Sequence, residues 1–294
     1  MTASHARPAA PGRYRNDLVL FMAIAFALSW ASWAVAIGIG GSSTKPPTLA
    51  FHVFGAFGPL IAALVIRIRR ARRGEPVPEH AVRFRPAALG WTPLLLALAS
   101  ALVLGAAFVA HAAGGPAPSL EDAKDVMTTY PGGPVAFLVN ILVAGPLAEE
   151  PGWRGTAYPR MRASLNRFQV SLILGVIWAV WHMPLFFIDG TVQNQLGVTS
   201  PSGVLFAVSA VPMAMLVCYA YERAGVLAAV AVHFATNLTM VLLSVQAPVT
   251  QAIVMGVQLI AAVVLLATVR PAGRPVADGP SLPAIPANRG AHVR

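Results

Sequence analysis

Ionisable side chains interrupt three otherwise apolar stretches of the chain, and these are the residues that could do chemistry. They lie in AGPLAEEPGWRG, LILGVIWAVWH and VLAAVAVHFATNLTM, and they are Glu149, Glu150, Arg154, His182, His233 and Asn237. Such groups are rare and costly inside a membrane and are functional there by default. Carboxylates and imidazoles serve general acid–base catalysis, metal binding and proton relays, so all three chemistries are open at this point.

The spacing of these residues separates their tasks. Glu150 and Arg154 are four residues apart on one helical face, where they can pair and neutralise each other. Glu149 is turned about 100° away from that face, so it is the freer carboxylate. His233 and Asn237 are also four apart and point together. Trp178 precedes His182 by one turn, where its ring can pack against the imidazole.

The three polar stretches are expected to meet at one depth. At 1.5 Å per helical residue, the height is roughly 16 Å for Glu149 above Arg160, roughly 22 Å for His182 above Arg167 and roughly 15 Å for His233 above Arg223. All therefore lie in one layer near the middle of the membrane. Pro146 and Pro151 free backbone carbonyls there, and irregular backbone at that depth is tolerated where it lines a wet cavity. We therefore expect a water-accessible chamber.

The composition is that of an integral membrane protein. Of 294 residues, 56% are hydrophobic and 11% are charged, with a mean hydropathy of +0.67, whereas soluble domains carry about a quarter charged residues. A membrane-spanning helix needs about 20 apolar residues. Eight segments qualify, at about 18–39, 47–66, 91–112, 133–157, 168–188, 203–221, 225–245 and 249–269. The expected fold is an all-α, polytopic bundle of about eight transmembrane helices.

Basic residues predict the orientation of this bundle. With eight spans and a cytoplasmic N-terminus, 19 of the 21 lysines and arginines fall on the inner side, and only Lys45 and Lys124 fall outside. This is the asymmetry of the positive-inside rule, and both termini are then cytoplasmic. The net charge of +10 is explained by topology, so nucleic acid is not an expected partner.

The expected organisation has three parts. Residues 1–16 form a cytoplasmic N-terminal segment, 17–269 the bundle, and 270–294 a cytoplasmic tail whose Pro, Ala and Gly content is typical of disorder. The excess of arginine over lysine is typical of a GC-rich bacterium, so the predicted location is a bacterial inner (plasma) membrane. The single cysteine, Cys218, lies in an apolar segment and excludes an intrachain disulfide.

Taken in order, the three motifs resemble the signatures of the CPBP intramembrane protease family. This family includes the type II CAAX prenyl endopeptidases and bacterial Abi-type proteins. Its EExxxR pattern matches Glu149 to Arg154, its FxxxH pattern matches Trp178 and His182 with Trp in place of Phe, and its HxxxN pattern matches His233 and Asn237. The resemblance covers about residues 50–245 and implies an eight-helix bundle.

The resemblance also implies an activity. The protein would be an intramembrane endopeptidase acting on a membrane-associated or lipid-modified peptide or protein, with the chamber reached from the inner side. Glu149 would be the base, His182 would hold or polarise the attacking water, and His233 and Asn237 would donate to the oxyanion. Glu150, Arg154 and Trp178 would support them.

Several alternatives stay open. Glu149, His182 and His233 could instead hold a zinc ion, although no HExxH motif is present, so the cofactor is either none or zinc. A non-catalytic bacteriocin-immunity or scaffold protein, or a proton-coupled transporter, would use the same residues differently. His52 and His111 lack a companion one turn away, and we expect them to be packing or interfacial residues.

Overall fold

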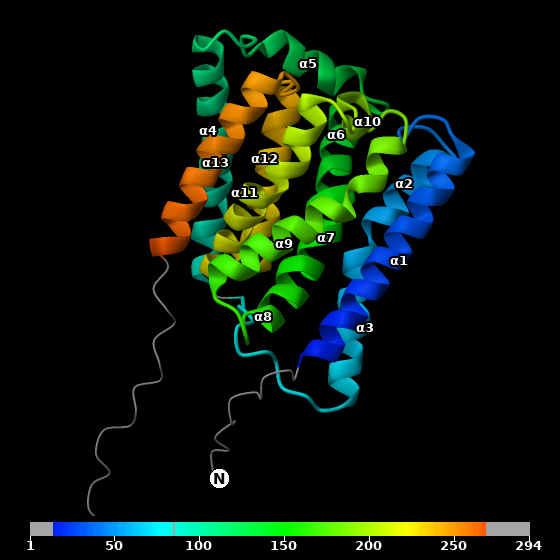
Figure 1. Ribbon diagram of the computed structural model, residues 1–294, viewed down its shortest axis with the longest axis vertical. Coiled ribbons are helices and arrows are strands. Elements are labelled where there is room, and N and C mark those ends of the chain that lie inside the picture. The colour runs from blue at the N-terminus through cyan, green and yellow to red at the C-terminus, as the bar shows by residue number, and fades with distance from the viewer. Residues whose placement is uncertain (1–13, 85, 269–294) are drawn as a thin grey trace, which may run out of the picture.

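Helices make up all the regular structure of the described residues, which are 14–84 and 86–268 of a computed structural model (Figure 1). No strand occurs within these two ranges. The expected all-α bundle is therefore confirmed. The predicted tail, 270–294, and most of the predicted N-terminal segment, 1–16, lie outside the described residues.

The long helices run up and down the molecule, and short helices lie at one end (Figure 1). The segment at 133–161 is interrupted by two π-helical turns. The helices are α1 (Arg15–Ile39), α2 (Thr48–Ala56), α3 (Gly58–Arg72), α4 (Ala87–Ala112), α5 (Leu120–Thr129), α6 (Gly133–Leu142), η1 (Val143–Leu147), α7 (Ala148–Gly152), η2 (Trp153–Ala157), α8 (Tyr158–Met161), α9 (Arg167–Trp181), η3 (Met183–Phe187), α10 (Val192–Leu196), α11 (Pro201–Ala224), α12 (Val226–Leu242) and α13 (Pro248–Thr268).

Every segment predicted to span the membrane is helical, but not all of them are long, straight spans. Six helical segments in the described part of the chain are long and apolar enough to cross a bilayer. The pair α2 and α3 would be a seventh span, bent by 44°. Pro59 stands in the first turn of α3, where a missing N–H favours a break. The eighth, α12, is apolar but has only 17 residues.

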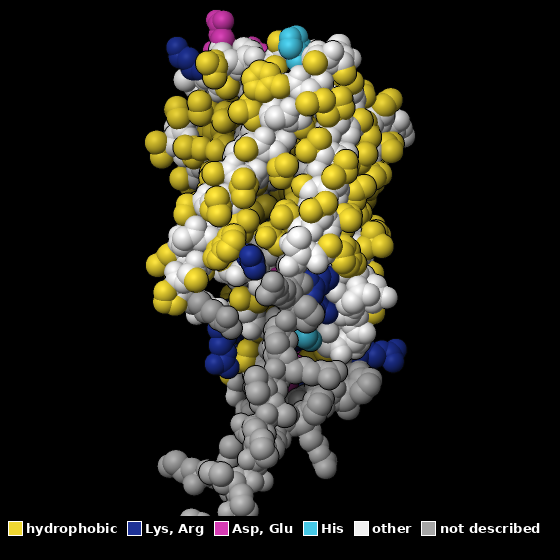
Figure 2. Space-filling model, turned by 90° about the vertical axis from the view of Figure 1, so that its left-hand side faces the viewer, with side chains coloured by type: hydrophobic (Ala, Val, Ile, Leu, Met, Phe, Trp, Pro, Cys, Tyr) yellow, Lys and Arg dark blue, Asp and Glu magenta, His cyan; other side chains and the backbone are white. Residues whose placement is uncertain are grey.

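Charge divides the two ends of the bundle. We call the end that carries α8 and the last turn of α3 the basic end; its described arginines include Arg15, Arg67, Arg69, Arg70, Arg72, Arg73, Arg160, Arg162, Arg167 and Arg223. The opposite, acidic end carries α5 with Glu121, Asp122 and Asp125 beside Lys124. Figure 2 shows hydrophobic side chains covering the surface between the two ends. The predicted segregation of basic residues to one end is therefore present in the structure.

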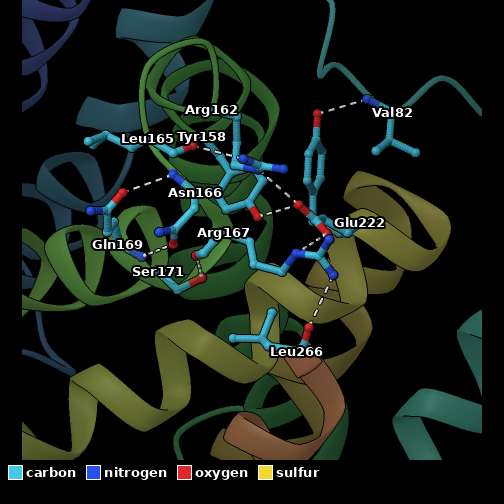
Figure 3. A network of polar contacts seen from close by, with 11 residues as sticks. Val82, Tyr158, Arg162, Leu165, Asn166, Arg167, Gln169, Ser171, Glu222 and Leu266 are labelled. Carbon is cyan, nitrogen blue, oxygen red and sulfur yellow. Dashed lines mark hydrogen bonds and ion pairs between the residues drawn. The ribbon is translucent and has the colours of Figure 1, made fainter. Parts of the chain in front are cut away.

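A carboxylate ties four helices together at the basic end (Figure 3). Glu222 of α11 accepts a hydrogen bond from the Tyr158 hydroxyl of α8 at 2.7 Å and from Nε of Arg162 at 3.1 Å. Nε of Arg167, at the start of α9, lies 3.9 Å from the same carboxylate. Arg167 also donates to the carbonyl of Leu266 in α13 at 3.1 Å. Residues far apart in the chain thus close this end of the bundle.

Candidate active site

Two wide π-helical turns flank the adjacent glutamates. Between η1 and η2 only the five residues of α7 are α-helical, and they carry Glu149 and Glu150. Pro146 lies inside η1 and Pro151 inside α7, and the carbonyl of Pro151 accepts from the Thr156 hydroxyl at 3.0 Å. Single π turns inside α-helices occur frequently at functional sites. The irregular backbone expected from the two prolines is therefore present.

Glu149 is buried and held by an indole. The side chain is 4% exposed, and its Oε2 accepts a hydrogen bond from Nε1 of Trp178 at 2.6 Å. The ring of Trp178 also packs edge-on against His182, at 5.2 Å between centroids, and against His233, at 5.0 Å. The predicted packing of Trp178 on His182 is confirmed, whereas its hydrogen bond to Glu149 is a contact that the spacing did not indicate.

Glu150 forms the centre of a second, fully buried group. Its Oε1 lies 3.1 Å from Nη1 of Arg154, which confirms the predicted pair, and neither side chain is more than 1% exposed. The same oxygen lies 2.8 Å from Nδ1 of His233. The sequence analysis did not expect this third member, because it comes from a helix distant in the chain. Glu150 therefore joins α7 to α12.

The two histidines have their Nδ1 atoms engaged. Nδ1 of His182 is 2.8 Å from the carbonyl of Trp178, which can only accept, so Nδ1 carries the proton. In the neutral ring, Nε2 then has a free lone pair. Nδ1 of His233 faces a carboxylate oxygen in the same way. His233 can donate to a second group only when both its nitrogens are protonated, with Glu150 as the counter-charge.

One cavity of about 630 Å³ brings the polar residues together. Glu149, Trp178, His182, His233 and Asn237 all line it. They come from α7, from the end of α9 and from α12, as the three sequence motifs predicted. A chamber next to the glutamates was expected from the prolines, and the cavity is that chamber.

Two residues in the cavity wall were missed or set aside. A Cβ added to Gly145 would lie 3.9 Å from both Nδ2 of Asn237 and Oε1 of Glu149, so the η1 backbone borders both of these groups. His52, expected to be a packing residue, also lines the cavity. His52 has no polar companion one turn away in the sequence, so residue spacing did not indicate that it belongs to the site. His111 lies near the acidic end, where its Nδ1 is 3.1 Å from the carbonyl of Gly115.

The cavity opens at the end opposite to the one expected. Its outer wall includes Thr129, Tyr130, Gln195 and Gln246, which belong to the acidic end. None of the arginines named at the basic end lines it. The expectation of entry from the arginine-rich side is therefore wrong, because the space between the glutamates and that side is filled by buried groups such as Arg154.

The metal-binding alternative finds no matching arrangement of donors. Within 14–84 and 86–268, no three His, Cys, Asp or Glu side chains are grouped so that they could hold a metal ion. Glu149, His182 and His233 share the cavity but do not form such a group. We therefore derive no step of the chemistry through a metal.

Comparison with known proteins finds similarity to CAAX prenyl proteases over the range that contains the motifs. The model of the Rce1-like family, described as type II CAAX prenyl endopeptidase Rce1-like, matches residues 131–239. This range includes all three motifs. The chain is also 24% identical over 239 residues to CAAX prenyl protease 2 of Methanococcus maripaludis, covering 79% of this chain and 87% of the relative.

The chain is thus similar to the type II CAAX proteases. The resemblance seen in the motifs is confirmed by both comparisons, and the apolar helices agree with a multi-pass membrane protein. Together they support an intramembrane endopeptidase of the type II CAAX protease kind. The matched range begins just before α6 and ends within α12, so it covers the helices that supply the cavity's polar groups.

Proposed function

We propose that this protein is an intramembrane endopeptidase whose base is Glu149. Its substrate would be a membrane-associated or lipid-modified peptide or protein; the name of the archaeal relative makes prenylated proteins one candidate class. The observation that carries the proposal is the shared cavity, which presents a carboxylate, two imidazoles and an amide to one space inside the bundle.

The first step is the attack of water on the peptide carbonyl. Glu149 takes a proton from the water as its oxygen adds to the carbonyl carbon, and the Trp178 N–H holds the carboxylate in place. His182 orients the water through the lone pair on Nε2. The carbonyl oxygen gains the electron pair and becomes an oxyanion. Asn237 donates to it through its amide, and His233 donates when doubly protonated.

The second step breaks the carbon–nitrogen bond. The proton held by Glu149 passes to the leaving nitrogen, so the products are a carboxylic acid and an amine and the carboxylate is restored. Glu150 and Arg154 take no part in these transfers. Their role is to brace α7 against α12, through the contact between Glu150 and His233.

The test is cleavage by the purified full-length protein in lipid vesicles. A panel of membrane peptides is offered to the wild type and to the Glu149→Gln and His182→Gln variants, both close in size to the native residue. We expect both variants to lose about 10²- to 10⁴-fold in rate while keeping the melting temperature of the wild type. Cleavage that survives both substitutions would remove Glu149 and His182 from the mechanism.

A chelator distinguishes metal-free hydrolysis from zinc-dependent hydrolysis. We expect the rate to be unchanged after treatment with a chelator. Loss of cleavage that is restored by Zn²⁺ would show that Glu149, His182 and His233 act as metal ligands. Tight peptide binding without cleavage, for every peptide tested, would favour a scaffold or immunity protein.

A further inference from the structure

We propose that the catalytic cavity is entered from the extracytoplasmic face of the membrane, so that peptide segments exposed on that face are the substrates. The side of entry stands on the structure and on charge distribution alone. The clause about substrates rests on the proposed function.

The mouth of the cavity is built from the acidic end of the bundle. Thr129 at the end of α5, Gln195 of α10 and Gln246 between α12 and α13 all line it and are exposed to solvent. In Figure 1, α5 and α10 lie at the end of the molecule away from α8. The route from solvent to Glu149 therefore starts among these elements.

The opposite side of the catalytic group is closed. Below the glutamates, Arg154 is 0% and Tyr158 is 0% exposed. Beyond them the Glu222 network joins α8, α9, α11 and α13 (Figure 3). The Tyr221 hydroxyl also accepts from the backbone N–H of Val82 at 3.0 Å, which holds the loop after α3 across this end. A peptide would have to break these contacts to enter from the basic end.

The positive-inside rule assigns the two ends to the two faces of a membrane. Loops that carry an excess of Lys and Arg stay in the cytoplasm. The basic end carries nearly all the described arginines, whereas Lys45 and Lys124 are the only Lys or Arg that the structure describes at the acidic end. The closed end is therefore cytoplasmic and the open end faces outward.

The cavity wall indicates the kind of segment that it would accept. Apart from Glu149, no Asp, Glu, Lys or Arg of the described residues lines it, so the wall offers no permanently cationic side chain for the free carboxylate of a C-terminal tail. Amide side chains are present instead, among them Asn140, Gln193 and Gln195. Amides both donate and accept, as the backbone of an extended peptide requires. We therefore infer an internal, uncharged segment as the substrate.

Single cysteines test the side of entry without using activity. Thr129→Cys and Gln246→Cys mark the mouth, and Ala71→Cys marks an exposed site at the basic end. The native Cys218 is buried, so the wild type is the matched background. A membrane-impermeant maleimide is added to spheroplasts or to inverted vesicles of a bacterial host that expresses the full chain.

We expect the two mouth cysteines to react in spheroplasts, and Ala71→Cys to react only in inverted vesicles. Reaction of Ala71→Cys from outside at the rate of the mouth cysteines would overturn the proposal. So would labelling of the mouth from the inside alone.

Blocking the mouth tests its connection to the active site. In detergent, where both ends are accessible, the maleimide adduct of Gln246→Cys should lose most of its peptide cleavage, and the adduct of Ala71→Cys should keep it. Equal cleavage by both adducts would overturn entry through the mouth. If the unlabelled wild type cleaves no peptide at all, the proposed function fails, and the labelling pattern still decides which face the cavity opens to.

Discussion

The Trp178 indole contacts four functional groups at once. Its N–H is bonded to Glu149, its ring edges meet the imidazoles of His182 and His233, and the guanidinium of Arg154 lies 4.9 Å from its centre. A ring of this size loses little conformational freedom on burial and orients each neighbour. We regard Trp178 as the positioning residue for the base.

Replacing this indole by a smaller ring separates packing from hydrogen bonding. Trp178→Phe keeps an aromatic ring but removes the donor to Glu149. A hydrogen bond to a charged group contributes about 1.5–3 kcal/mol, so we expect kcat to fall about 10- to 100-fold with little change in KM. Steady-state kinetics on a cleaved peptide measure both constants. An unchanged kcat would show that the hydrogen bond does not position the base.

Glu150 is expected to matter for folding more than for chemistry. Glu150→Gln leaves the Arg154 charge buried without its anion, and breaking a buried pair in this way costs about 3–5 kcal/mol. We expect a marked fall in melting temperature in detergent. Glu75→Gln is the control, because its ion pair with Arg73 is partly exposed and contributes at most about 1 kcal/mol. Equal melting temperatures for the two variants would contradict a bracing role.

At the scale of elements, the site depends on how closely α7 approaches α3. A Cβ on Gly152 would lie 2.5 Å from the backbone carbonyl oxygen of Pro59, a distance that no relaxed contact allows. Small residues let membrane helices pack backbone to backbone in this manner. The position of the glutamates is therefore fixed in part by a residue without a side chain.

A methyl group at this position should push the two helices apart. We expect Gly152→Ala to lower stability by about 1–3 kcal/mol, the usual cost of overpacking, and to lower the cleavage rate as well. Gly105→Ala in α4 is the matched control, because no atom lies within 4 Å of its added Cβ. That variant should be neutral or slightly more stable, since Ala favours helix over Gly. Thermal unfolding of the Gly152→Ala and Gly105→Ala variants measures the difference in stability.

Sequence patterns predicted the elements better than their interruptions. The apolar runs located all eight helical segments, since hydropathy over about 20 residues directly reflects the thickness of the bilayer. Irregular backbone was expected from Pro146 and Pro151, but its form as π turns and the placement of His52 in the cavity were not predictable. Both depend on which neighbouring helix approaches the backbone, and that information is not local in the sequence.

At the scale of the molecule, the meeting of the three motifs was predicted but the opening of their cavity was not. Counting residues along each helix predicted that Glu149, His182 and His233 meet, and all three line one cavity. The side of entry depends on which end the short helices α5 and α10 leave open. Neither helix has a hydropathy signal, and α10 has only five residues.

The basic end should respond to the loss of one carboxylate. Glu222→Gln removes the charge that Tyr158, Arg162 and Arg167 share. Because hydrogen bonds to a charged partner contribute about 1.5–3 kcal/mol, we expect a lower melting temperature in detergent. The control is Glu79→Gln, at an exposed position of the loop between α3 and α4. It should have the melting temperature of the wild type. A melting temperature of Glu222→Gln equal to that of the wild type would show that this network does not hold the basic end closed.

The wide turn η1 has a consequence for chain length. A π turn holds about one residue more than an α turn, so it absorbs an insertion without rotating the helix on either side. Deleting one residue from Val143–Leu147 should then leave Glu149 and Glu150 on their present faces and withdraw only the Gly145 backbone from the cavity. In the resulting α turn, Pro146 would collide with the preceding turn of the helix. We therefore expect relatives that are one residue shorter here to lack this proline, and an alignment gap at η1 to mark a changed turn with the two glutamates still in place.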